Sequence, residues 1–488
     1  MKNSSRALLA VVLLAGFPVL VLVIVAALVA LEIYAFSDSP SIGVRLAFFA
    51  VPAIYVLLQA LFTIERGRDD EVSGLPLTRE AQPELWALVR ELAEAVDTRP
   101  PDEIYLIPQV NASVYEQTRW LGLRVTRRRM FIGAQLFAGL RIDQLRSVLG
   151  HELAHYSNRD TRFADVTYRG RQAIGRVVDG LADANGLGWL LRPLFNGYTK
   201  LYFTVSMRVS RDHELAADAA AARVAGTAAA TSALRESEAL EVLWQFYLDT
   251  YVGMGWRAGY LPDRLADGFR QLLADEHRVE ELAEVRRNPP PQKVSPFDRH
   301  PATPARIAVL EAAPEVPVLP GGERPATRIL RDADTVLDAA MLTGLSAEAR
   351  SKQRTDWQTL VDISMRHQLR KATDKILRSR SVTDLLDALD AGKLEDVADS
   401  DVKVPPNAGP RARRELLGAS ARANLSIVVT SALAAAKAAR WELSWSGPAK
   451  LVLTEPYAES LTPALDAAVA GDTGALRTLL AVTEPVLS

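Results

Sequence analysis

A long uncharged stretch near the amino terminus most limits what this chain can fold into. No residue from Ala7 to Leu31 is charged, and a helix of that length can cross a hydrocarbon core of about 30 Å. A second uncharged stretch, Leu46 to Ile64, is near the lower end of the spanning range. A cleaved signal peptide is the alternative, but its apolar part is usually only about 7 to 15 residues long. The sequence therefore predicts a two-span hairpin, with spans at about 7–31 and 46–64.

The basic residues around these stretches predict how the hairpin is oriented. Lys2 and Arg6 precede the first stretch, and Arg66 and Arg68 follow the second, whereas the connection between the stretches holds only Arg45. The positive-inside rule places basic flanks in the cytoplasm. We therefore expect a multi-pass protein of the cell membrane, anchored in the lipid bilayer, whose remaining residues face the cytoplasm.

The motif His151-Glu152-Leu153-Ala154-His155 lies within a stretch whose apolar residues recur at helical spacing. On a helix, residues four apart share one face, so the two imidazoles can reach a single metal ion, and Glu152 can still reach a water on that ion. The pattern is typical of zinc hydrolases. The alternative is a plain pair of surface or core histidines. The apolar stripe that predicts the helix consists of Ile142, Leu145, Val148, Leu149 and Leu153.

Two histidines leave a catalytic zinc site incomplete, because such sites usually take three protein ligands. The stretch from Ser210 to Val224 reads as a second helix that ends at Gly226. In it, Glu214 and Asp218 are four residues apart, so one of them can ligate the metal while the other, one turn away, hydrogen-bonds a ligand histidine. His213 is a competing ligand, and an exposed acidic pair on an ordinary helix is the simpler interpretation.

Composition narrows the chemistry further. The chain has no cysteine, which excludes disulfides and thiolate ligands, so a metal site must use histidine and carboxylate. A net charge of -2 gives no reason to expect nucleic-acid binding. The main basic cluster, Arg124 with Arg127, Arg128 and Arg129, is expected to face water or lipid headgroups.

Together these segments resemble a known family, the integral-membrane zinc metalloendopeptidases that include the heat-shock protease HtpX and the CAAX prenyl protease. The resemblance covers about residues 75 to 312. It rests on H-E-L-A-H followed, some sixty residues later, by S-R-x-x-E-x-x-A-D. Three flanking pieces also match: Pro108 to Ala112, Asn158 to Asp160, and His300-Pro301 followed by Arg306.

The resemblance implies roles for the metal site. His151, His155 and Glu214 would hold Zn²⁺, one ion per chain, and Glu152 would be the general base on the bound water. Zinc lowers the pKa of its water to about 7, so a carboxylate can take the proton at neutral pH. Glu152 would then pass that proton to the leaving amine. Asp218 would orient a ligand histidine.

The resemblance also implies how polypeptide substrates bind. The chain around Asn111 and Ala112 would form the edge strand above the active site and add a substrate as an extra strand. Such pairing tolerates many sequences, so broad specificity is expected. His300 would stabilise the oxyanion or gate the zinc, although a His-Pro junction can also be purely structural.

The expected fold class is α+β, mainly helical, in three parts. The hairpin of residues 1–68 precedes a zincin-like metallopeptidase domain, 69–325, with a helix at Thr78–Val96 and a small β-sheet that includes strands at Glu103–Ile107 and Arg128–Ile132. Pro-rich segments mark the boundary to a mostly helical domain, 326–488, of unassigned role, with a possible hairpin of Trp441–Trp445 and Lys450–Leu453.

One stretch departs from the HtpX pattern. HtpX proteases carry two more strongly apolar segments between the motif and the glutamate ligand, whereas Leu181–Val209 holds four charged residues. Residues 189–207 are expected to form a core helix or to lie at the membrane interface. Without further spans, prenyl-protein processing is not expected, and quality control of membrane proteins fits better.

Two functions from different classes remain at this point. One is an active membrane-anchored zinc endopeptidase that cleaves unfolded or damaged proteins. The other is a membrane-tethered interaction scaffold, whose carboxy-terminal domain binds a partner while the peptidase domain is latent or inactive. The sequence favours the enzyme, because the three proposed ligands and Glu152 are all present.

Overall fold

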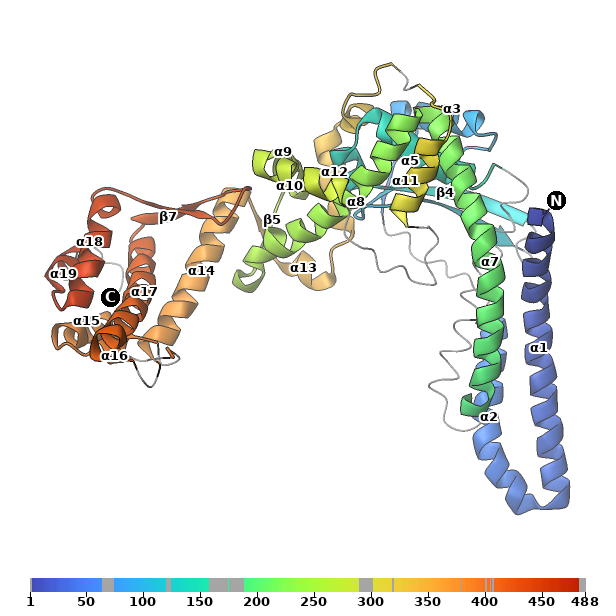
Figure 1. The fold of residues 1–488 in the computed structure, drawn as a ribbon, viewed down its shortest axis with the longest axis horizontal. Coiled ribbons are helices and arrows are strands. Elements are labelled where there is room, and N and C mark those ends of the chain that lie inside the picture. Colours follow the sequence, from blue (N-terminus) through green and yellow to red (C-terminus); the bar gives the residue numbers. More distant parts are fainter. Residues whose placement is uncertain are drawn as a thin grey trace. The chain divides into compact units, whose positions relative to one another are not determined.

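A computed structural model describes residues 2–63, 74–119, 124–157, 174, 188–288, 302–317, 320–378, 380–399, 402–403, 405 and 408–481. The chain is mainly helical with small sheets (Figure 1), which confirms the predicted α+β class. The helices of the first half are α1 (Lys2–Asp38), α2 (Pro40–Thr63), α3 (Pro83–Ala95), α4 (Ala134–Gly139), α5 (Ile142–Ala154), α7 (Gly188–Ala225) and α8 (Thr227–Thr250). Those of the second half are η1 (Val252–Ala258), α9 (Leu265–Ala274), α10 (Glu276–Arg287), α11 (Thr303–Ala312), η2 (Ala326–Ile329), α12 (Ala333–Thr343), α13 (Ala347–Ser351), α14 (Trp357–Leu377), α15 (Val382–Asp390), α16 (Leu394–Val397), α17 (Pro410–Ala435), α18 (Tyr457–Ala470) and α19 (Gly474–Ala481).

The chain forms two compact units. The first comprises Met1–Leu243 and Leu282–Gly344, and the second comprises Trp244–Glu281 and Leu345–Ser488. The second unit thus takes up a segment from the middle of the chain. All residues proposed above for metal binding and catalysis that the structure describes belong to the first unit.

Within the described residues, three helices are long and apolar enough to cross a membrane. Two of them are the predicted hairpin, Val12–Asp38 of α1 and Pro40–Gln59 of α2, and the third is α17. Pro18 and Pro52 lie inside the first two helices. The apolar side of α17 packs into the core of the second unit, where Leu425, Val429 and Leu433 are fully buried.

Helix α7 begins beside the apolar hairpin. Its residues Phe195 and Tyr202 are fully buried against Phe17 of α1 and Leu57 of α2. Residues 189–207 therefore form the first half of one long helix, α7, that packs on the hairpin (Figure 1). The second half of the same helix carries Glu214.

In the part of the chain that the structure describes, the main sheet has four strands in the order β1-β2-β4-β3. They are β1 (Leu75–Pro76), β2 (Glu103–Ile107), β3 (Ala112–Arg119) and β4 (Arg124–Gly133). Strand β2 has the predicted bounds, whereas β4 is longer than predicted. Strand β4 runs parallel to β2 and antiparallel to β3, which leaves β3 at one edge of the sheet.

A glycine allows α5 and α7 to pack closely. A Cβ atom on Gly150 would lie 2.6 Å from Cγ2 of Val224, so only glycine fits there without a shift. The close contact brings the motif on α5 beside the acidic residues on α7. It also explains why a helix-weakening residue directly precedes His151.

The second unit has its own helical core around α14, α15, α17 and α18. Its two small sheets are β5 (Tyr260–Pro262) with β6 (Gln353–Thr355), and β7 (Ala439–Glu442) with β8 (Lys450–Leu453). The predicted hairpin is present, but its first strand begins and ends earlier than expected. Trp441 is buried on this strand because it faces the helical core.

Candidate metal centre

Three nitrogen and oxygen donors converge between α5 and α7. His151 lies in the last turn of α5, and His155 directly follows that helix. Their Nε2 atoms are 3.1 Å apart. The carboxylate of Glu214 lies between them, with Oε2 3.5 Å from Nε2 of His151 and Oε1 3.6 Å from Nε2 of His155. His151 and Glu214 are buried, and His155 is partly open to solvent.

These separations fit a tetrahedral zinc site. Zinc binds histidine nitrogen and carboxylate oxygen at about 2.0–2.2 Å, so two ligands of a tetrahedral ion lie about 3.3 Å apart. The three observed separations, 3.1, 3.5 and 3.6 Å, scatter around that value. His151, His155 and Glu214 form a metal-binding group, and the donor set matches the two histidines and one glutamate of known zinc peptidases.

A buried ion pair between Asp218 and Arg306 contacts the ring of His151 on the side away from the other two donors. Oδ1 of Asp218 accepts a hydrogen bond from Nδ1 of His151 at 3.0 Å. Nη2 and Nε of Arg306, on α11, donate to the two oxygens of Asp218 at 2.6 and 2.9 Å. Because His151 uses Nδ1 for Asp218, its Nε2 points towards the other two donors. Both Asp218 and Arg306 are buried.

These contacts shift two pKa values. Burial alone would lower the pKa of His151, but the Asp218 and Glu214 carboxylates raise it to about 9. Burial would raise the pKa of Asp218, but hydrogen bonds from Arg306 and His151 hold it at about 2. At neutral pH, Asp218 is therefore ionised, and the metal must compete with a proton for His151.

A cleft of about 150 Å³ opens beside the metal-binding group. Glu152 lines it, next in sequence to His151, which lines it too. Asn111 and Ala112, at the start of the edge strand, line it as well. The remaining wall is mostly small and apolar: Leu136, Val148, Ala221, Ala230, Ala233, Leu234 and Leu310. The cleft therefore suits an apolar side chain next to a polar reaction centre.

The structure brings together most of the residues singled out from the sequence. His151, Glu152, His155, Glu214, Asp218, Asn111 and Ala112 all lie at or beside the cleft. His213 is not part of the metal-binding group formed by the described residues. His300 lies outside the described residues.

Sequence reasoning left Arg306 without a role. The sequence places it five residues after His300-Pro301, but its burial and its pairing with Asp218 depend on contacts 88 residues apart. One argument could have assigned it a role. A second carboxylate buried beside a ligand histidine needs a nearby cation, and arginine is suited to bidentate hydrogen bonding with a carboxylate.

Comparison with known proteins agrees with the geometry. Residues 79–313 match the model of peptidase family M48. The chain is 27% identical over 254 residues to a protein described as "Protease HtpX homolog" from Kineococcus radiotolerans. The matched region covers 49% of this chain and 75% of the relative. No solved structure matches significantly. The chain therefore belongs to peptidase family M48, as a metallopeptidase and a distant homologue of HtpX.

Proposed function

We propose that this protein is a membrane-anchored, zinc-dependent endopeptidase that acts in quality control of membrane and cytoplasmic proteins. The observation that carries the proposal is the convergence of two imidazoles and one carboxylate in His151, His155 and Glu214, beside a cleft that is lined by His151 and Glu152. A stoichiometry of one zinc per chain is proposed, because the described residues contain one such group of three donors.

The side chains around the cleft have complementary tasks in peptide hydrolysis. His151, His155 and Glu214 would hold the zinc, which polarises the scissile carbonyl and acidifies a water when bound. Glu152 accepts a proton from the attacking water at a carboxylate oxygen and returns it to the leaving amine. Asp218 fixes the ring of His151 through Nδ1. His300 is proposed to stabilise the oxyanion or to gate the centre.

Substrate binding is proposed to use the backbone at Asn111 and Ala112. Both residues line the cleft, and β3 lies at the edge of the sheet, where an extended peptide can pair with it. The apolar wall accepts one side chain of the peptide. Main-chain pairing and a single apolar contact together favour extended, unfolded segments over a defined sequence.

The course of helix α7 supports the proposal that the substrate is cleaved close to the membrane. Tyr202 is the last fully buried residue of this helix in the apolar cluster with α1 and α2, and Glu214 follows twelve positions later on the same helix. At 1.5 Å per residue, this is about 18 Å along the helix axis. With the hairpin in the bilayer and the amino terminus in the cytoplasm, the centre would face chains at the cytoplasmic surface of the membrane.

The test of the function uses purified, detergent-solubilised protein. We expect about one zinc per chain by elemental analysis and cleavage of casein that is lost in Glu152→Gln, because that variant keeps the metal ligands but lacks the base. Equal cleavage by the variant would contradict the mechanism. No cleavage by either form would favour the alternative, a membrane-tethered scaffold with a latent peptidase domain.

Two further measurements address the biological role. Glu152→Gln protein should retain bound polypeptides when isolated from membranes, and unfolded membrane proteins should be enriched among them. A reporter fused after Ser488 should be active only in the cytoplasm. Activity only on the opposite side would contradict the orientation.

A further inference from the structure

Strand β3 lies at the edge of the main sheet formed by the described residues, and the backbone groups of its alternate residues face away from β4. The N–H of Gly133 donates to the C=O of Asn111 at 2.7 Å, so the carbonyl of the residue just before β3 faces β4. In an antiparallel pair such contacts recur at every second residue. The register is regular as far as Gln117. The backbone groups of Ala112, Val114 and Glu116 therefore point away from β4, towards the outer side of β3.

The partner strand agrees with this assignment. Arg128, opposite Glu116, uses its N–H and C=O on the β2 side, where both contact Asp102. A residue that is bonded towards β2 does not pair with β3, so Glu116 and its alternate neighbours face the edge. A peptide that adds to β3 would meet the backbone of Ala112 first, because Ala112 lines the cleft, and then that of Val114.

A tyrosine side chain already occupies the second of these positions. The hydroxyl of Tyr156 donates to the C=O of Val114 at 2.5 Å. Tyr156 directly follows the metal ligand His155, and its own C=O accepts from Oγ1 of Thr98 at 2.9 Å. The end of the motif is thus bonded to the edge strand on one side and to the segment after α3 on the other.

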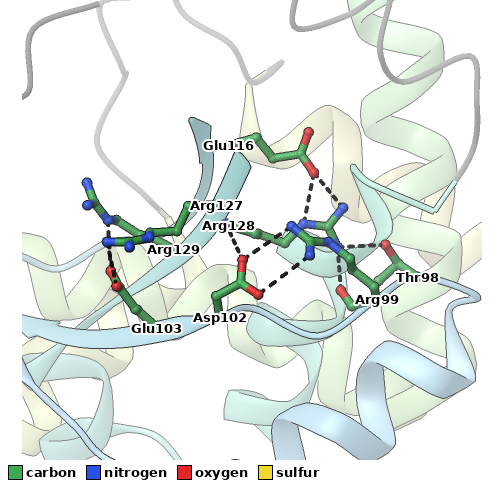
Figure 2. Close-up of polar contacts among 8 residues, drawn as sticks. All are labelled: Thr98, Arg99, Asp102, Glu103, Glu116, Arg127, Arg128 and Arg129. Atoms are coloured by element: carbon green, nitrogen blue, oxygen red, sulfur yellow. Dashed lines mark hydrogen bonds and ion pairs between the residues drawn. The ribbon is translucent and has the colours of Figure 1, made fainter. Parts of the chain in front are cut away.

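A buried arginine fixes the ring of this tyrosine. The guanidinium of Arg128 lies over the Tyr156 ring, 5.0 Å from its centroid. Figure 2 shows how Arg128 is itself held: it donates to Glu116 at 2.6 and 2.9 Å, to Oγ1 of Thr98 at 3.0 Å and to the C=O of Arg99. Arg128 is 6% exposed, so this part of the basic cluster faces the protein interior, contrary to the sequence-based expectation.

We propose that Tyr156 determines how far a substrate pairs with the edge strand. By occupying the C=O of Val114, its hydroxyl ends the pairing after the residue opposite Ala112. A peptide antiparallel to β3 reaches Val114 with the residue two positions nearer its amino terminus, so pairing is cut short on that side. The proposal rests on the proposed peptidase function and makes Tyr156 a specificity-determining residue.

The test is a methylation scan of a peptide substrate. A casein-derived peptide cleaved at one bond is prepared with each backbone amide N-methylated in turn, which removes one hydrogen-bond donor at a time. For the wild-type protein we expect one strongly sensitive amide near the cleaved bond, opposite Ala112. The amide two residues towards the amino terminus should change kcat/KM less than twofold.

Tyr156→Phe should free the carbonyl of Val114. The unmodified peptide should then be cleaved with a kcat/KM about two- to tenfold higher, as expected for one added hydrogen bond. Methylation two residues before the sensitive amide should remove that gain. Tyr105→Phe is the matched control, because it also deletes a hydroxyl bonded to a neighbouring group, Glu103, but on β2, away from the outer side of β3.

Two results would overturn the proposal. One is a wild-type scan in which alternate amides are already equally sensitive, which needs no variant and holds even if Tyr156→Phe misfolds. The other is a folded Tyr156→Phe protein with the wild-type profile. Absence of cleavage by wild type would instead contradict the proposed function, and the same peptides could then be scanned for binding to Glu152→Gln protein.

Discussion

Removal of the Arg306 side chain should weaken the metallopeptidase fold even without a metal. Arg306 makes two short hydrogen bonds to Asp218, and both side chains are over nine-tenths buried. Deleting one partner of a buried ion pair leaves an uncompensated charge and costs roughly 3–5 kcal/mol. For a unit of this size, 1 kcal/mol corresponds to about 2 °C, so Arg306→Ala should lower the unfolding midpoint by roughly 6–10 °C.

An exposed ion pair that also involves helix α11, the helix of Arg306, provides the control. Arg235 of α8 contacts Glu311 of α11 at 2.7 Å, but both side chains are more than one-third exposed. Such pairs contribute about 1 kcal/mol or less, so Arg235→Ala should lower the midpoint by about 2 °C at most. The midpoint of Arg306→Lys should fall between those of the two alanine variants, because lysine keeps the charge but cannot form the bidentate pair.

The assay is thermal unfolding of chelator-treated, detergent-solubilised protein at pH 7, followed by circular dichroism. The pKa of Asp218 is lowered from 3.8 to about 2 in the folded protein, so the stabilisation by the pair is complete above about pH 4 and is lost as the pH falls through 2. Wild type and Arg306→Ala should therefore converge in acid. An equal midpoint for Arg306→Ala and Arg235→Ala at pH 7 would refute this reasoning.

Two other predictions concern the metal and the helix contact. The pKa of His151 is raised to about 9 before a cation binds, so zinc must displace a proton, and its apparent affinity should rise about tenfold from pH 7 to pH 8. Titration against a chelator of known pH dependence measures this, and a flat affinity would contradict it. Gly150→Ala should destabilise the fold by about 1–3 kcal/mol, because the added methyl group meets Val224 of α7. Chemical unfolding of the detergent-solubilised variant measures that loss, and wild-type stability would show that the helices can move apart at little cost.

Local patterns predicted the parts of the site that depend on one helix. Residues four apart share a helix face, so the two histidines of the motif, and Glu214 with Asp218, could be grouped before any fold was known. The bounds of β2 and the presence of a β7–β8 hairpin follow from similar short-range signals. One distant pairing, between the motif and Glu214, came from the resemblance to known proteases and from the need for a third ligand.

Contacts between distant segments were beyond such patterns. Arg306 pairs with Asp218 through the packing of α11 against α7, and Tyr156 reaches Val114 through the position of α5 beneath the sheet. Neither pairing can be recognised from a periodic pattern in the sequence. The same holds for residues 244–281, which join the carboxy-terminal unit because of tertiary contacts and not because of their composition.

Charge balance explains why the centre needs Arg306. The carboxylates of Glu152, Glu214 and Asp218 lie within one mostly buried region, and three negative charges there would repel one another strongly. Arg306 offsets one of them permanently, and a divalent cation would offset the other two. Before a cation binds, a proton on His151 offsets part of the remaining charge, which is why its pKa is raised despite burial. The cation thus replaces a proton in a site already arranged for positive charge, so metal binding requires little rearrangement of the side chains.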